Sequence, residues 1–123
     1  MNTLKFEIIT GINEGYKYNN KSEKDLHKVE ILWQNVAKNL FTKTGIYISA
    51  VISKNKTVYN VDWGCPVGGE DTYRITGIAN PEFVTDLEMW KDAVLEATKI
   101  LKNELKQSTI NCEFSKVEFY YFK

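Results

Sequence analysis

Two amphipathic helical segments, each set between stretches with the two-residue period of β-strands, constrain the fold more than any other feature. In the second segment, over residues 85–106, hydrophobic side chains recur every three or four positions, which places them on one face of an α-helix. We expect this helix to begin at Thr85, which with Glu88 has the pattern of a capping box. The stripe that faces the core is predicted to contain Leu87, Trp90, Val94, Ala97, Leu101 and Leu105.

The first helical segment is predicted over residues 22–43. Ser22 followed by Asp25 resembles a motif that begins a helix, and Gly45 suits the left-handed conformation that ends one. The single histidine, His27, falls away from the hydrophobic stripe, so we interpret it as a solvent-facing residue. The stripe itself is predicted to contain Leu26, Val29, Trp33, Val36, Ala37 and Leu40.

Strands are expected where hydrophobic and polar residues alternate. The turn residues 54–56 predict a hairpin, because asparagine tolerates a positive φ. Near the C-terminus the hydrophobic residues change from even to odd positions, which predicts a β-bulge near Ser115 and Lys116. The predicted strands cover residues 3–9, 46–52, 58–63, 72–79 and 110–121.

The expected order of elements is strand, helix, two or three antiparallel strands, helix, strand. Residues 1–123 are long enough for one domain with a single core. This order favours an α+β fold, a ferredoxin-like two-layer sandwich with two helices on one face of an antiparallel sheet. The resemblance rests on the order of elements, and no family-specific motif accompanies it.

Charge and composition disfavour several classes of partner. Sixteen basic residues balance sixteen acidic ones, so no net field attracts nucleic acid or an anionic membrane. The N-terminus lacks the pattern of a secretory signal, and no hydrophobic run is long enough to span a bilayer, so a cytoplasmic location is expected. Lysine supplies all the basic residues except Arg74, a bias typical of A+T-rich genes in some bacteria and their phages.

The segment from Asn60 to Asp71 is the most unusual stretch of the chain. It holds three of the seven glycines and one of the two cysteines, but its glycine spacing does not match a phosphate-binding loop. One histidine and two distant cysteines do not form a zinc motif, so we expect no metal site and no cofactor. Cys65 and Cys112 are expected to be reduced in the cytoplasm.

The residues that we select as binding or interface candidates lie in or beside this segment. Arg74 can bind a carboxylate or a phosphate through two hydrogen bonds, although pairing with a carboxylate of the chain itself is the preferred interpretation. Strand alternation predicts that several aromatic residues and Val51 lie on the sheet face without helices. The candidates are Tyr47, Trp63, Cys65, Glu70, Asp71, Tyr73 and Arg74.

No motif in the sequence names a reaction or a substrate. Our first hypothesis is a small non-catalytic binding or oligomerising domain that uses the open sheet face, with self-association as a homodimer and a small-molecule ligand as a further option. The alternative is a small enzyme whose pocket is lined by the Asn60–Asp71 loop and Arg74. Nucleic-acid binding is the least favoured of the three, because net charge is zero and the RNA-recognition signature is absent.

Overall fold

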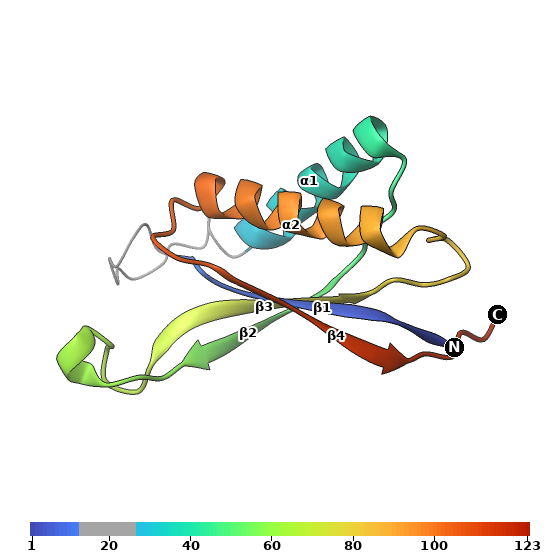
Figure 1. Ribbon diagram of the computed structural model, residues 1–123. Helices are drawn as coiled ribbons and strands as arrows, with labels where there is room; N and C mark the ends of the chain where they lie inside the picture. Colours follow the sequence, from blue (N-terminus) through green and yellow to red (C-terminus); the bar gives the residue numbers. More distant parts are fainter. Residues whose placement is uncertain (13–26) are drawn as a thin grey trace.

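The computed structural model describes residues 1–12 and 27–123 and shows two layers, with both helices on the same face of one sheet (Figure 1). The four strands are antiparallel and lie in the order β2-β3-β1-β4. The predicted α+β two-layer sandwich is confirmed. The elements along the chain are β1 (Asn2–Gly11), α1 (Lys28–Thr44), β2 (Val51–Thr57), the 3-10 helix η2 (Val61–Trp63), β3 (Glu70–Ile78), α2 (Leu87–Glu104) and β4 (Asn111–Glu118).

The core is centred on Phe6 in β1, whose side chain is fully buried. The ring of Phe6 lies 5.7 Å, centroid to centroid, from Trp33 of α1 and also 5.7 Å from Trp90 of α2. On the neighbouring strand Phe6 pairs with Gly77, where a Cβ would come within 2.6 Å of the Phe6 ring and 2.3 Å of the Ser49 carbonyl oxygen. Glycine at this position therefore leaves the space that the Phe6 ring occupies.

The observed helix ends confirm the predicted caps only in part. Gly45 ends α1 in a left-handed conformation with φ of 74°, and its N–H donates to the Phe41 carbonyl, as predicted. The predicted cap at Ser22 and Asp25 lies outside the described residues. The prediction that Thr85 caps α2 is wrong by one residue. Asp86 has the extended backbone of a cap, and its carboxylate accepts a hydrogen bond from the Met89 N–H at 3.0 Å.

The predicted hairpin turn over residues 54–56 is wrong, because β2 runs straight through it. Each turn residue pairs with β3, in the registers Lys54 with Tyr73, Asn55 with Thr72 and Lys56 with Asp71. The chain reverses instead over residues 58–69, while residues 46–50 precede the strand. Local turn preference is overridden here by pairing with β3, which includes an ion pair of 2.6 Å between Lys56 and Asp71.

The predicted β-bulge in β4 is also wrong. Pairing between β1 and β4 is continuous from Asn2 with Glu118 to Ile9 with Asn111. Cys112 and Phe114 face the helices, and the ammonium group of Lys91 lies 5.4 Å from the centre of the Phe114 ring. The change from even to odd positions therefore marks a change in the face that carries hydrophobic residues, with no extra residue in the strand. Neither helix in the described part of the chain has the length and hydrophobicity needed to cross a membrane.

The cap of α2 yields a stability prediction. Asp86→Ala removes the side-chain acceptor for the Met89 N–H and is expected to lower the free energy of unfolding by about 1 kcal/mol. Thr85→Ala should change it by less than about 0.5 kcal/mol, because Thr85 precedes the cap. Urea unfolding of both variants tests the assignment, and a larger loss for Thr85→Ala would contradict it.

Candidate functional site

The β2–β3 hairpin extends past the helices at the end of the sheet opposite both chain termini (Figure 1). We call residues 58–69, which connect the two strands, the hairpin arm. The side chain of Asn60 accepts from the Asp62 N–H at 2.9 Å and begins η2, and Gly64 ends η2 in a left-handed conformation. Cys65 is buried in the arm, where its sulfur lies 3.5 Å from the Tyr59 nitrogen and 3.3 Å from the Pro66 carbonyl oxygen. These contacts fold the arm onto itself.

Glu70 lies where the arm joins β3, and its carboxylate is hydrogen-bonded to the side chain of Tyr59. Both residues are half-buried. Burial raises the pKa of Glu70 above its ordinary value of 4.5, while the hydrogen bond from Tyr59 opposes this shift without cancelling it. The join between arm and sheet therefore carries a partly desolvated carboxyl group with one fixed donor.

A row of hydrogen-bonded side chains continues from Glu70 along the hairpin. Thr57 stands directly opposite Glu70, and its Oγ1 lies 2.9 Å from Oγ1 of Thr72. The Thr72 hydroxyl donates to Oδ1 of Asn55 at 2.6 Å. Strand alternation and the register place all four side chains on the sheet face without helices. Thr72 is only 3% exposed, so this row is a fixed part of the structure.

Asp71 and Tyr73 belong to the opposite face of β3, toward the helices. The Asp71 carboxylate is bound by the ammonium group of Lys56 at 2.6 Å. Tyr73 is 4% exposed, and burial, together with the charges of Glu30 and Asp71, raises the pKa of its hydroxyl. Glu70 and Asp71, although adjacent in sequence, therefore face different surroundings.

Arg74 shares the open face with Glu70 but binds another acidic group, the carboxylate of Glu7 in β1. Its guanidinium holds the pKa of Glu7 below the usual range. Glu113 of β4 pairs with Glu7, and the hydrogen bond between the two carboxyl groups raises the pKa of Glu113. The preferred interpretation of Arg74, pairing with a carboxylate of the chain, agrees with this contact.

Tyr47, Trp63 and Tyr73 do not form the predicted aromatic surface on the open face. Tyr47 precedes β2 and contacts Phe83 edge-to-face at 5.8 Å, while Trp63 lies in the arm with 78% of its surface exposed. Tyr73 belongs to the core, so of Tyr47, Val51, Trp63 and Tyr73 only Val51 lies on the open face, where it borders a hollow with Phe119 and Tyr121. The prediction is wrong because β2 begins at Val51, which leaves Tyr47 outside the sheet. The open face carries Lys5, Glu7, Arg74, Glu113 and Ser115 around a hollow of about 230 Å³.

Sequence analysis missed Tyr59, Thr57, Thr72 and Asn55 as site residues. The sequence signal that existed was the spacing of Glu70, Thr72 and Arg74, which puts alternate residues of a strand on one face. Their partners on β2 depend on a register that the misplaced turn concealed.

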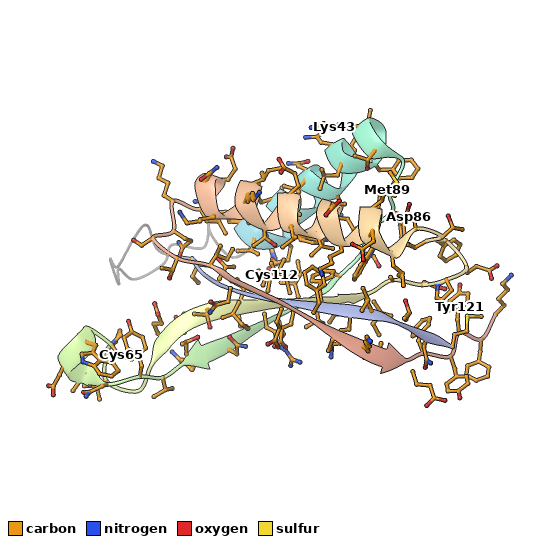
Figure 2. All side chains as sticks on the ribbon, viewed as in Figure 1. Lys43, Cys65, Asp86, Met89, Cys112 and Tyr121 are labelled. Carbon is orange, nitrogen blue, oxygen red and sulfur yellow. The ribbon has the colours of Figure 1, made fainter. Side chains whose placement is uncertain are left out.

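The described chain also holds a groove and two cysteines outside this row of hydrogen bonds. A groove of about 670 Å³ lies between the start of α2 and the end of β4, and it mixes hydrophobic residues with charges of both signs. No group of three or more His, Cys, Asp or Glu side chains suited to a metal ion occurs among residues 1–12 and 27–123. Cys65, at the end of the arm, lies far from Cys112 beneath α2 (Figure 2), and both cysteines are free. The groove is lined by Asn2, Thr3, Leu4, Leu87, Glu88, Lys91, Lys116, Val117 and Glu118.

Comparison with known proteins gives a family and a fold. A family model described as SAM lyase matches residues 1–123. A phage SAM lyase in complex with S-methyl-5'-thioadenosine is 17% identical, with a TM-score of 0.62 over 98% of this chain and 93% of that chain. A phage SAM lyase in the apo state is 14% identical, with a TM-score of 0.57 over 99% and 94% of the two chains. No curated protein matches the sequence.

These findings overturn the hypothesis of a non-catalytic binding or oligomerising domain. A family of lyases matches the whole chain, so that hypothesis is wrong. The alternative, a small enzyme, agrees better with the comparisons. The sequence hypothesis failed because it inferred a binding surface from aromatic residues that the fold places apart.

The environment of Glu70 yields a prediction about stability and pH. Because the folded-state pKa of Glu70 is raised, the stability that its protonated form contributes is complete below pH 4.5 and is lost as pH rises through the raised value. Glu70→Gln stays neutral, so at pH 7 we expect its melting temperature to exceed that of the wild type. The difference should shrink toward pH 4.

Thermal unfolding followed by circular dichroism at the two pH values measures this effect. Asp71→Asn is the matched control, because it removes a carboxylate that Lys56 already binds and should not raise the melting temperature at pH 7. A gain for Glu70→Gln that is equal at both pH values would contradict the assigned cause.

Proposed function

The chain belongs to the SAM lyase family, and on that premise we propose that it cleaves S-adenosylmethionine (SAM) to S-methyl-5'-thioadenosine. The family model covers the whole chain. The chain also shares its fold with a phage SAM lyase that binds S-methyl-5'-thioadenosine. Both observations support an enzyme that acts on a small cationic substrate.

Comparison of substrate and product identifies the bond that breaks. S-methyl-5'-thioadenosine keeps the methyl group, the sulfur and the adenosyl group, so cleavage occurs between sulfur and the γ-carbon of the amino-acid part. The sulfur leaves with both bonding electrons as a neutral thioether. If the α-carboxylate of the substrate attacks the γ-carbon, the remaining fragment closes to homoserine lactone. Atoms and charge then balance without water and without proton transfer.

This reaction sets particular demands on a binding site. The positive sulfonium and the negative carboxylate neutralise each other as the lactone forms, so a site of low polarity favours the transition state. An anionic residue beside the sulfur would stabilise the substrate more than the transition state. The α-ammonium group keeps its charge throughout, so it is the part of the substrate that an acidic residue can bind without slowing the reaction.

The observation that carries our choice of site is the half-buried Glu70 carboxylate held by Tyr59. We assign to Glu70 the binding of the cationic amino-acid end of the substrate, and to Tyr59 the orientation of Glu70. Arg74 is bound to Glu7, which leaves the attacking carboxylate of the substrate free of a guanidinium that would lower its nucleophilicity. Cys65 is buried in the arm and has a structural part in this scheme.

The first experiment is product analysis. Purified protein incubated with SAM is expected to release S-methyl-5'-thioadenosine and homoserine lactone, detected by liquid chromatography with mass spectrometry. Glu70→Gln should lower kcat/KM about 10- to 100-fold, because a hydrogen bond to a charged group contributes about 1.5–3 kcal/mol. Asp71→Asn, which alters the adjacent carboxylate on the other face, should stay within about threefold of the wild type.

Each result has a distinct meaning. A wild type that releases no S-methyl-5'-thioadenosine would overturn the proposed activity. If the wild type is active and Glu70→Gln has the same kcat/KM, the substrate binds elsewhere. A vinyl amino acid in place of the lactone would show elimination by a base and would exclude attack by the substrate carboxylate.

The sequence predicts a homodimer through the open sheet face. We propose self-association again, but through the hairpin arm. The hairpin arm and its join to β2 expose four hydrophobic residues, Val58, Val61, Trp63 and Val67. A second copy of the chain that packs on the arm would remove this surface from water. We also retain the cytoplasmic location and the reduced state of Cys65 and Cys112 as predictions.

Light scattering at micromolar concentration tests the assembly. The wild type is expected to have at least twice the mass of one chain, and Trp63→Glu should lower it, because the charge would be buried in the interface. Tyr47→Glu, an aromatic-to-glutamate change away from the arm, should keep the wild-type mass. A monomeric wild type would refute self-association.

A further inference from the structure

The hydroxyl groups beside Glu70 have a defined direction of donation. The Thr72 hydroxyl donates its single hydrogen to Oδ1 of Asn55 at 2.6 Å. In its contact of 2.9 Å with Thr57, Oγ1 of Thr72 must therefore accept. The hydrogen of the Thr57 hydroxyl is thereby committed to Thr72, and only its lone pairs remain for other partners.

The strand register places the Thr57 side chain beside that of Glu70. Thr57 and Glu70 are directly opposite on β2 and β3, and side chains in such pairs are separated by about 5 Å at their Cβ atoms. The Tyr59 side chain also donates to the Glu70 carboxylate. Thr57 and Glu70 thus present two acceptors on neighbouring strands, and two such acceptors suit a group with several donors.

S-adenosylmethionine offers two cationic groups, and only one of them has hydrogens to donate. The α-ammonium group carries three N–H donors, whereas the sulfonium carries none. Resting on the function proposed above, we propose that Oγ1 of Thr57 is a substrate-binding atom that, together with the Glu70 carboxylate, accepts hydrogen bonds from the α-ammonium group. Thr72 and Asn55 are positioning residues, because they keep the Thr57 hydroxyl turned away from Glu70.

The burial of Thr72 strengthens this assignment. Thr72 is 3% exposed, so water does not compete for its hydrogen bonds. Donation from Thr57 to Thr72 and from Thr72 to Asn55 is therefore maintained. If the Thr72 hydroxyl were absent, Thr57 would be free to donate to Glu70. Thr57 would then occupy the carboxylate that the ammonium group needs, and it would stabilise the ionised form of Glu70.

The test compares SAM with its deamino analogue, in which hydrogen replaces the α-ammonium group and from which S-methyl-5'-thioadenosine is still released. Thr57→Val is expected to lower kcat/KM for SAM about tenfold, mainly through a higher KM, because the ammonium charge is the same in the ground and transition states. With the deamino analogue, the same substitution should lower kcat/KM less than about twofold. Thr57→Ser keeps the acceptor and should restore the rate with SAM.

Thr72→Val and Thr72→Ser supply an independent readout. In Thr72→Val the Thr57 hydroxyl can donate to Glu70, so the acidic limb of the pH profile of kcat/KM should move to lower pH than in the wild type. Thr72→Ser should retain the wild-type limb. A purely structural role of Thr72 predicts a lower melting temperature with no movement of the limb.

The outcomes separate this inference from the proposed function. Suppose that the wild type is active and that Thr57→Val lowers kcat/KM equally for SAM and for the deamino analogue, or for neither. This result would overturn the role of Thr57 and leave the lyase activity standing. A wild type that cleaves neither compound would overturn the lyase activity, and the substrate assignment with it.

Discussion

The packing of Phe6 between Trp33 and Trp90 ties both helices to the sheet, and the remaining structure depends on it. Phe6 lies in β1, a central strand, and its ring occupies the space left by Gly77 on β3. One ring therefore sets the position of two helices and of two strands. With the helices confined to one face, the other face and the far end of the hairpin stay available for function.

Beyond the helices, the register of β3 against β2 decides which polar groups meet. Strand alternation sends Glu70 and Thr72 to the open face and sends Asp71 toward Lys56 on the other. Two carboxylates adjacent in sequence thus face opposite sides of the sheet, and burial raises the pKa of Glu70. The hairpin is both a structural extension and the scaffold of the proposed site.

The proposed reaction explains why the sequence contains no recognisable catalytic motif. Attack by the substrate's own carboxylate transfers no proton and needs no nucleophile from the protein. The chain then has to bind the substrate, fold it and exclude water, tasks that many combinations of residues can perform. The proposed site consists of a threonine, a tyrosine and a glutamate around one hairpin, and none of them is distinctive in a sequence.

The sequence by itself determined the two helical stripes, the order of elements and the α+β class, because hydrophobic periodicity is a local property that survives in any context. It also placed Glu70 among the candidate residues. Only the tertiary structure decided that β2 continues through residues 54–56, that Tyr47 and Tyr73 lie apart, and that Tyr59 meets Glu70. The physical reason is that a shift of one residue in strand pairing reverses every side chain. Register depends on contacts between strands, such as that of Thr57 with Thr72, which no single segment encodes.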